Sequence, residues 1–294
     1  MAGIMERYEE IIPDFERFKE VAKTHQPREV RVNTLKSSVS EVKRMFDREG
    51  VEYEQRDWNP RFFRIDSSPG KLFSHWLGKI YGQESVSGIP SLALEPKPGE
   101  KVLDLCAAPG SKTTQIAALM GNQGEIFAND KSSNRLRSLV ANVYRTGALN
   151  VQTFQRDARN LPEDWKFDKV LVDAPCSAEG NLREKEELRQ GADISQVESL
   201  SELQKALLGK GFRLLKEGGT LVYSTCTFAP EENEEVVAEF LGGAELVDLS
   251  FDFSHSNGLT SWKGEAFPSK LENAVRVYPH QLDSGGIFVA KFEG

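Results

Sequence analysis

Residues 101–113 read KVLDLCAAPGSKT, a short apolar run followed at once by small residues, a proline and a glycine. The apolar run predicts a buried strand, and the residues after it predict a tight turn that leads into a helix ending near residue 119. Small side chains in such a turn let a ligand approach the backbone closely at the beginning of a helix. The stretch therefore predicts a ligand-binding turn of an α/β protein.

The sequence after residue 90 alternates between short apolar runs and longer amphipathic stretches. The runs predict strands and the longer stretches predict helices. This alternation is typical of an α/β fold with a mostly parallel sheet, helices on both faces and right-handed crossovers. The predicted strands lie at 101–105, 125–128, 151–154, 169–172 and 220–223, and the later helices at 132–146, 195–215 and 231–241.

The first 90 residues have a different pattern. An acidic amphipathic helix is predicted at 4–23, a strand at 29–35, a helix at 39–49 that Gly50 ends, and two short strands at 51–55 and 62–65. This order predicts a small α+β module. We therefore expect two domains, residues 1–90 and residues 91–294.

The composition is that of a soluble globular protein, with 39% hydrophobic and 28% charged residues. No apolar stretch approaches the roughly 20 residues that cross a bilayer, and Met1 to Tyr8 lack the basic and then apolar layout of a secretory signal. We expect a cytoplasmic protein with no membrane partner. In that compartment the three cysteines are expected to be reduced, and because they are not spaced like a zinc site, no metal is expected.

The net charge of −8 argues on its face against a nucleic-acid partner, because binding to phosphates needs a basic surface. The charge is segregated along the chain, however. Residues 231–239 are dense in glutamate, whereas the stretch from Lys131 to Arg156 has no acidic residue and also carries Arg135, Arg137 and Arg145. This basic run is either a partner-binding patch or an ordinary solvated helix face.

Two common phosphate-binding motifs fit the turn poorly. A P-loop needs a second glycine upstream of Gly110, and the dinucleotide fingerprint needs three spaced glycines. Two acidic residues favour another ligand: Asp130, after the second strand, is suited to hold ribose hydroxyls or to cap the next helix, and Asp157, after the third strand, is suited to hold an adenine. A turn of small residues with these two acids fits S-adenosylmethionine in a Rossmann-type methyltransferase.

Two of the three cysteines lie where a predicted strand ends. Cys176 follows the strand at 169–172 in the sequence DAPC, and Cys226 follows the strand at 220–223 in the sequence STCT. Ligands bind at strand ends in open α/β sheets, so this placement predicts an active site with two thiols. Packing is the default interpretation of a single cysteine, and we expect it for the side chain of Cys106.

The chain resembles the RNA cytosine-5 methyltransferases of the NOL1/NOP2/Sun family. The resemblance rests on residues 104–113, 173–177 and 224–227, and extends to 31–36, 81–87, 279–280 and 286–290. It departs at Ala178-Glu179-Gly180, where the family more often has a glycine, a small hydroxyl residue and a glycine. The resemblance implies an S-adenosylmethionine-dependent catalytic domain, a small N-terminal RRM-like domain that binds RNA, and RNA as the substrate.

The family implies unequal roles for the two thiols, with Cys226 as the nucleophile and Cys176 as the residue that assists release. Analogy to DNA cytosine methyltransferases would instead make Cys176 the nucleophile. Asp173 is expected to bind the base and Lys112 to bind its carbonyl or to tune a thiol, with a surface lysine as the alternative. The residues expected to bind the cofactor are Cys106, Ala107, Ala108, Pro109, Gly110, Ser111, Lys112, Asp130, Arg135, Asp157 and Asp173.

The short form of the chain resembles archaeal members that modify tRNA, and ribosomal RNA is the second candidate substrate. Two other functions stay open: a 2′-hydroxyl RNA methyltransferase, which would need a lysine-rich site and no thiols, and a non-catalytic RNA-binding protein. Arg31 and Asn33 are either packing residues or RNA contacts.

Overall fold

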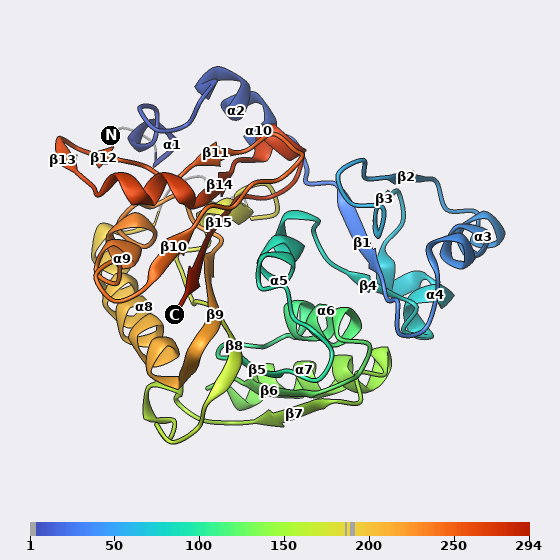
Figure 1. Cartoon of the computed structure of the whole chain (residues 1–294). Helices are drawn as coiled ribbons and strands as arrows, with labels where there is room; N and C mark the ends of the chain where they lie inside the picture. Colours follow the sequence, from blue (N-terminus) through green and yellow to red (C-terminus); the bar gives the residue numbers. More distant parts are fainter. Residues whose placement is uncertain (1–3, 186, 189–191) are drawn as a thin grey trace. The chain divides into compact units, whose positions relative to one another are not determined.

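A computed structural model describes residues 4–185, 187–188 and 192–294 (Figure 1). The chain forms two compact units. Met1–Gln26 and Val172–Gly294 form one, which we call the thiol-pair unit, and Pro27–Leu171 form the other, which we call the turn unit. The two predicted domains, 1–90 and 91–294, rest on the change in sequence pattern near residue 90 and remain a prediction.

The turn unit contains parallel strands in the order β8-β5-β6-β7. Each of the pairs β5/β8, β5/β6 and β6/β7 is parallel, and a helix follows both β5 and β6, as crossovers between parallel strands require. The predicted alternation is confirmed here. The elements are β5 (Lys101–Asp104), α6 (Ser111–Leu119), β6 (Glu125–Asn129), α7 (Ser133–Thr146), β7 (Val151–Phe154) and β8 (Phe167–Asp173).

The same unit holds a second, antiparallel sheet in the order β2-β3-β1-β4. Its core contains Val30, Val42, Phe46 and Phe63, so that α3 packs on one face of this sheet. Gly50 ends α3 as predicted, with a φ of 69°. The elements are β1 (Arg28–Val32), α3 (Val39–Glu49), β2 (Tyr53–Gln55), β3 (Phe62–Ile65), α4 (Phe73–Trp76), β4 (Ile80–Gly82) and α5 (Ile89–Ala93).

The thiol-pair unit contains antiparallel strands in the order β11-β14-β15-β9, with β10 also paired to β15. The prediction of a mostly parallel sheet is therefore wrong: the fold has a mixed sheet. The connection at 278–286 between β14 and β15 is too short for a crossover of a dozen or more residues, and so these neighbours are antiparallel. The strands are β9 (Leu215–Thr225), β10 (Glu245–Val247), β11 (Ser256–Asn257), β12 (Ser261–Trp262), β13 (Glu265–Ala266), β14 (Val275–Val277) and β15 (Ile287–Glu293).

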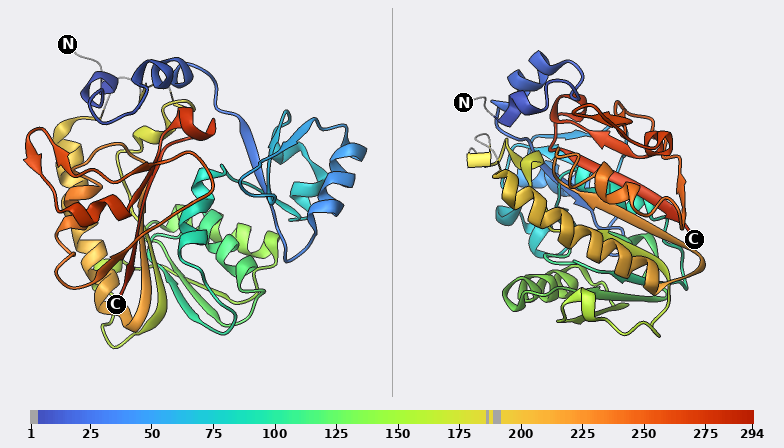
Figure 2. Two further views of the ribbon diagram at one scale, coloured as in Figure 1. Left: turned by 45° about the horizontal axis from the view of Figure 1, so that its top comes forward. Right: turned by 90° about the vertical axis from the view of Figure 1, so that its left-hand side faces the viewer.

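The long helix α8 (Ile194–Leu214) runs along β9 and contacts α9 (Glu234–Ala238), as the two views of Figure 2 show. The helix predicted at 231–241 is shorter than expected. Its first residues instead form turns in which the Glu232 and Glu235 N–H groups donate to the carbonyls of Ala229 and Pro230.

The single helix predicted at 4–23 is wrong. The segment forms α1 (Ile4–Arg7) and α2 (Phe15–Ala22), because Pro13 interrupts the helix and Asp14 adopts a left-handed φ of 48°. Both helices belong to the thiol-pair unit, where α2 contacts α10 (Pro279–Leu282). The shared core contains Tyr8, Phe18, Phe228, Trp262 and Tyr278.

Candidate active site: a thiol pair and a ligand-binding turn

The structure brings the two strand-end cysteines together in the thiol-pair unit. The Sγ atoms of Cys176 and Cys226 are 3.3 Å apart, and the two cysteines are partly buried and not joined by a disulfide. The strand ends are joined by the Ala174 N–H, which donates to the carbonyl of Ser224 at 2.9 Å. The two cysteines that follow strand ends in the sequence are therefore in direct contact through their sulfur atoms.

Asp173, the last residue of β8, lies on the same edge. Its Oδ1 accepts a hydrogen bond from the Ser224 hydroxyl at 2.8 Å. This bond ties the carboxylate to the strand that leads into Cys226. Asp173 is only partly buried, so part of its surface is open to a ligand.

A short 3-10 helix, η4 (Glu179–Asn181), holds the Cys226 loop. The Gly180 N–H donates to the Cys226 carbonyl at 2.8 Å, and the Asn181 side-chain amide lies 3.6 Å from the Cys226 sulfur. A Cβ at Gly180 would lie 2.6 Å from the Gly286 carbonyl oxygen and 2.9 Å from that of Cys226. Only glycine fits between these two backbone segments.

The family departure at residues 178–180 has a structural explanation. Ala178 has a left-handed φ of 61°, a conformation that glycine adopts more easily. Glu179 is only 1% exposed, and its carboxyl group accepts a hydrogen bond from the Tyr8 hydroxyl at 2.6 Å and lies 3.1 Å from the Thr227 hydroxyl. Glu179, which is larger than the residue the family more often has here, is therefore accommodated by Tyr8 and Thr227. The sequence resemblance did not identify these partners.

A second buried carboxyl group, Glu232, lies beside the Cys176 loop. Its Oε2 accepts from the Ser177 N–H at 3.0 Å and from Gln204 Nε2 at 2.7 Å, and its Oε1 accepts from the Ser177 hydroxyl. Sequence reasoning noted Glu232 only as part of an acidic run. The sequence signal that could have identified Glu232 is Asn233, which interrupts the acidic run. The helix begins only after Asn233, so Glu232 lies before it.

These neighbours shift the protonation of the site. The hydrogen bond to Cys226, burial and the nearby charges of Cys226 and Glu232 raise the pKa of Cys176 well above that of an ordinary thiol. Burial is the main cause that raises the pKa of Glu179 and of Glu232. These surroundings therefore favour the neutral form of the Cys176 thiol.

The predicted ligand-binding turn lies between β5 and α6 in the turn unit. Gly110 has a φ of 105°, and a Cβ there would lie 2.7 Å from Leu139 Cδ1, so that the turn requires glycine. The Ala108 N–H donates to the Asp130 carboxylate at 3.3 Å. Of the other turn residues, Ala107 is buried, Cys106 and Ser111 are partly buried and Pro109 is exposed.

Asp130 is buried at the end of β6 and organises the turn. Besides Ala108, its carboxylate accepts from the Ser132 N–H at 2.8 Å and pairs with Arg135 at 3.4 Å. Arg135 also donates to the Ala108 carbonyl. Ser132, rather than Asp130, caps α7, because its side chain accepts from the Arg135 N–H. The alternative role of Asp130 as a helix cap is therefore wrong.

Asp157 and Lys112 have different surroundings. The Asp157 carboxylate accepts two hydrogen bonds from the Arg159 guanidinium, at 2.9 and 2.6 Å, and lies 3.4 Å from Lys131 Nζ. Hydrogen bonding from Arg159 is the main cause that lowers the pKa of Asp157. Lys112 is only 9% exposed and its Nζ lies 3.4 Å from the Ser87 hydroxyl, so the alternative of a surface lysine is wrong.

Arg31 and Asn33 link the antiparallel sheet of the turn unit to the helices α6 and α7. Arg31, 2% exposed, donates to Gln83 Oε1 at 2.6 Å and to the Thr114 hydroxyl at 3.1 Å. Asn33 is also buried and donates to the carbonyls of Gly78 and Thr146. Both side chains are therefore packing residues of this unit.

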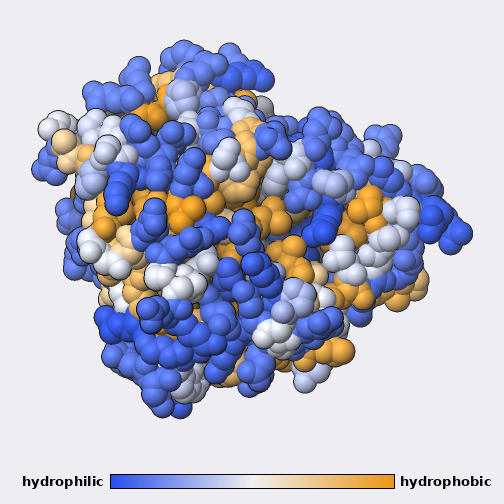
Figure 3. All heavy atoms as spheres, in the orientation of Figure 1, coloured by the Kyte–Doolittle hydropathy of each residue, from blue (hydrophilic) through white to orange (hydrophobic). Residues whose placement is uncertain are grey.

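The basic run from Lys131 to Arg156 is not one free patch. Lys131 and Arg135 pair with aspartates, and Arg145 donates to the carbonyls of His75 and Ile80. Hydrophilic residues cover most of the surface drawn in Figure 3, and hydrophobic residues appear in separate areas.

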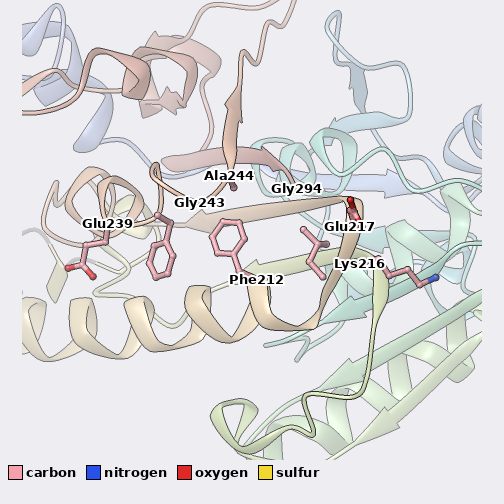
Figure 4. A pocket seen from close by; sticks show the side chains of 9 residues that line it. Phe212, Lys216, Glu217, Glu239, Gly243, Ala244 and Gly294 are labelled. Atoms are coloured by element: carbon pink, nitrogen blue, oxygen red, sulfur yellow. The ribbon is translucent and has the colours of Figure 1, made fainter.

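A further cavity, of about 370 Å³, contains no residue of the thiol pair or of the turn. Figure 4 shows its lining, which includes Phe212 of α8, Lys216 of β9 and Gly294. Among the described residues, no cluster of three or more His, Cys, Asp or Glu side chains could hold a metal. In the same part of the chain, no helix has the length and apolar character needed to span a membrane.

Known proteins match almost the whole chain. A family model described as 16S rRNA methyltransferase RsmB/F matches residues 91–293. The tRNA (cytosine(49)-C(5))-methyltransferase of Pyrococcus abyssi is 37% identical over 98% of this chain and 94% of that protein. Ribosomal RNA small subunit methyltransferase F of Aeromonas salmonicida is 39% identical over 92% of this chain, which spans 59% of that protein.

The fold agrees with these matches. The structure of NSun6 from Pyrococcus horikoshii with SFG superimposes with a TM-score of 0.87 and 26% identity, covering 100% of this chain and 98% of that one. The strand-end cysteines, the Asp-Ala-Pro-Cys segment and the small-residue turn all lie within the matched region. The chain belongs to the RsmB/F, or NOL1/NOP2/Sun, family of S-adenosylmethionine-dependent RNA cytosine-5 methyltransferases.

Proposed function

We propose that this chain methylates carbon 5 of cytosine in RNA, through a covalent bond between Cys226 and the base. The observation that carries the proposal is the pair of thiols, with sulfur atoms 3.3 Å apart, beside the carboxylate-bearing end of β8. A 2′-hydroxyl methyltransferase has no use for such a pair, and a non-catalytic RNA-binding protein has no reason to keep it.

S-adenosylmethionine, when bound, supplies the methyl group. The turn unit fits it because Asp130 and Asp157 follow neighbouring parallel strands, β6 and β7, and the turn after β5 carries small residues. We assign ribose binding to Asp130 and adenine binding to Asp157. The proposed cofactor residues are Cys106 through its backbone, Ala107, Ala108, Pro109, Gly110, Ser111, Lys112, Asp130, Arg135, Asp157 and Asp173.

Carbon 5 of cytosine is a weak nucleophile until a nucleophile adds at carbon 6. The Cys226 thiolate forms the bond to carbon 6, and the electron pair of the carbon 5–carbon 6 double bond then becomes available at carbon 5. After carbon 5 has accepted the methyl group, its proton must leave and the bond from carbon 6 to sulfur must break. Cys176, as the second thiol, assists this release.

The surroundings of the two sulfurs support these unequal roles. Two thiolates 3.3 Å apart would repel each other, so one thiol stays protonated and donates to the other. The raised pKa of Cys176, beside Glu232, favours Cys176 as the neutral thiol. The Asn181 amide beside the Cys226 sulfur favours a thiolate at that position.

Asp173 and Lys112 are proposed to act on the base. The Asp173 carboxyl group is suited to bind the exocyclic amine and ring nitrogen 3 of cytosine, and its bond with Ser224 fixes its orientation. The buried ammonium of Lys112 is suited to bind the carbonyl of the base.

The substrate is proposed to be tRNA, because the relative named for tRNA matches the chain over nearly the full length of both proteins. Ribosomal RNA is the second candidate, favoured by the family model and by the relative named for the small ribosomal subunit. The target cytosine must leave its stack to reach a thiol, which requires an unpaired or easily flipped base.

The residues before 90 are proposed to form an RRM-like RNA-binding module within a functional domain 1–90. The order β1-α3-β2-β3-α4-β4 and the four-stranded antiparallel sheet support this proposal. One sheet face packs on α3 and part of the other is covered, since Arg31 and Gln83 bond to α6 residues. RNA is therefore expected on another surface of the module.

A groove between α3 and α4 is the best candidate. Its lining includes Arg44, Arg48 and Phe73, and Phe73 and Trp76 are 64% and 70% exposed. Exposed aromatic rings can stack on unpaired bases, and arginines can bind the phosphates between them.

We also propose that the enzyme is cytoplasmic, because reduced thiols are typical of that compartment.

The proposal is tested by incubating the enzyme with labelled S-adenosylmethionine and with tRNA or small-subunit ribosomal RNA. We expect label in 5-methylcytosine, and bisulfite sequencing will report the RNA and the position together. Label in 2′-O-methylribose would contradict the proposal. Cys226→Ala should abolish turnover, and Cys176→Ala should leave a denaturation-resistant RNA adduct that the double variant does not form.

A further inference from the structure

A continuous chain of hydrogen bonds joins two buried glutamates next to the thiol pair. Glu179 Oε2 contacts the Thr227 hydroxyl at 3.1 Å, this hydroxyl contacts the Ser177 hydroxyl at 2.7 Å, and the Ser177 hydroxyl contacts Glu232 Oε1. We call these four residues the hydroxyl wire. Ser177 and Thr227 directly follow Cys176 and Cys226, so the wire connects the backbones of both cysteines.

The number of hydrogens in the wire determines its charge. Each of the three contacts needs one hydrogen between its two oxygens. The hydroxyls of Ser177 and Thr227 supply one each, and an ionised carboxylate supplies none. The third hydrogen must therefore come from a carboxyl group, so that one of the two glutamates is protonated in the folded protein.

The remaining partners identify which glutamate is protonated. Glu232 accepts from the Ser177 N–H, the Ser177 hydroxyl and Gln204, which together stabilise a negative charge. Glu179 has a buried Oε1 with no hydrogen-bond partner in the described part of the chain. An ionised Glu179 would leave that oxygen charged and unpaired, which is costly in a buried site.

We propose that Glu179 carries the shared proton and Glu232 the negative charge, and that the wire positions the thiol pair for the reaction. Donors then run in one direction, from Glu179 to Thr227, to Ser177 and to Glu232. The charge of Glu232 keeps Cys176 a neutral thiol, and the bond between the two hydroxyls holds the cysteine loops together. Both glutamates are positioning residues, and this inference rests on the proposed roles of the thiols.

Other titratable groups face the wire and are included in the assignment. Tyr8 donates to Glu179 Oε2, and the Tyr223 hydroxyl donates to the Glu232 carbonyl. Burial raises the pKa of both glutamates, which agrees with one of them being neutral. The charged or titratable groups that also act on these residues are Arg7, Cys176, Cys226, Asp173, Glu231 and Glu234.

A pair of isosteric variants tests the assignment without requiring activity. In Glu179→Gln, the amide N–H₂ can donate to the Thr227 oxygen, while the Tyr8 hydroxyl loses its acceptor, so the melting temperature of the full chain should fall less than in Glu232→Gln. In Glu232→Gln, an amide N–H₂ at the Oε2 position would face the N–H donors of Ser177 and Gln204, and one at the Oε1 position would reverse the wire and leave a buried, ionised Glu179. The melting temperature should therefore fall by several degrees. Glu202→Gln, at an exposed residue of α8, is the control. An equal or reversed order of the first two variants would overturn the assignment.

The pH dependence of stability gives a second test. A neutral buried Glu179 has a raised pKa, so its contribution to stability is present at low pH and is lost as pH rises through that pKa. Glu179→Gln should remove this decline from the curve of unfolding free energy against pH. A decline that persists unchanged in this variant would show that Glu179 does not hold the proton.

The effect of the two glutamates on the ionisation of Cys176 is measured by alkylation. Iodoacetamide reacts with the thiolate, so the rate of Cys176 alkylation against pH reports the ionisation of this thiol. We expect Glu232→Gln to shift that profile to lower pH and Glu179→Gln to leave it in place. An unshifted profile in Glu232→Gln would remove the thiol-tuning role. Because none of these three assays uses RNA, failure of the proposed methylation would leave their outcomes readable.

Discussion

Gly180→Ala is expected to damage the site of the thiol pair. The new Cβ would lie 2.6 Å from the Gly286 carbonyl oxygen and 2.9 Å from the Cys226 carbonyl oxygen. Both neighbours are backbone atoms, which cannot rotate away as a side chain can. The backbone segments must therefore move apart.

The size of the effect follows from the bonds that hold these segments. The Gly180 N–H donates to Cys226 and the Gly286 N–H donates to Gly180, at 2.8 and 3.0 Å. Loss of two such bonds costs about 1 kcal/mol each, and overpacking adds about 1–3 kcal/mol. We therefore expect a loss of roughly 3–5 kcal/mol in unfolding free energy. A displacement near 1 Å of Cys226 is expected to lower the methylation rate by about 100-fold.

The assays are urea unfolding and single-turnover methyl transfer to RNA. Gly242→Ala is the matched control in the same unit, because a Cβ there has nothing within 4 Å. The reasoning would be refuted if Gly180→Ala kept the stability and the methylation rate of the control. A stable variant with a slow rate would assign the whole effect to the position of Cys226.

Three further predictions concern the core, the thiols and RNA. Arg276→Met should cost about 3–5 kcal/mol in urea unfolding, because it leaves the buried carboxylate of Glu234 without its guanidinium partner; a cost below about 1 kcal/mol would contradict this. Cys176 should be alkylated by iodoacetamide only at a pH above the range of ordinary thiols, since its pKa is raised, and mass spectrometry that finds it the faster thiol at neutral pH would reverse the assigned roles. The double change Arg44→Glu and Arg48→Glu should weaken RNA binding and reduce its salt slope by about 1 per arginine, and an unchanged slope would remove the groove from the RNA surface.

The sequence pattern predicted most elements but not the direction of every strand. The strand at Val151–Phe154 and the helix at Val39–Glu49 have the predicted bounds, because their hydrophobic periods are regular and a glycine ends the helix. Strand direction depends on connections and partners, so the antiparallel strands after residue 245 were not predicted. In residues 4–23, the amphipathic period continued across Pro13, although the helix does not.

The positions of the two cysteines in the candidate site were predictable, because they follow from the order of strands along the chain. Cys176 and Cys226 end two strands, and strand ends of one sheet edge lie close together. The buried state of Glu179 and Glu232 was not predictable, because a glutamate in sequence is ordinarily a surface residue. Burial of these two groups depends on hydroxyl and amide partners that no local pattern connects with them.

Tyr8 shows why the unequal state of the thiols is a property of the fold. Its hydroxyl donates to Glu179 from a position 171 residues away in the chain, and its ring packs against Phe228 and Trp262. The N-terminal segment, which the sequence assigned to the RNA-binding domain, thus supplies a donor to the wire beside the two cysteines that we propose as catalytic. Because a neutral Glu179 directs the hydrogens toward Glu232, the charge falls next to Cys176. Two cysteines in similar strand-end motifs therefore differ in protonation because of residues that neither motif contains.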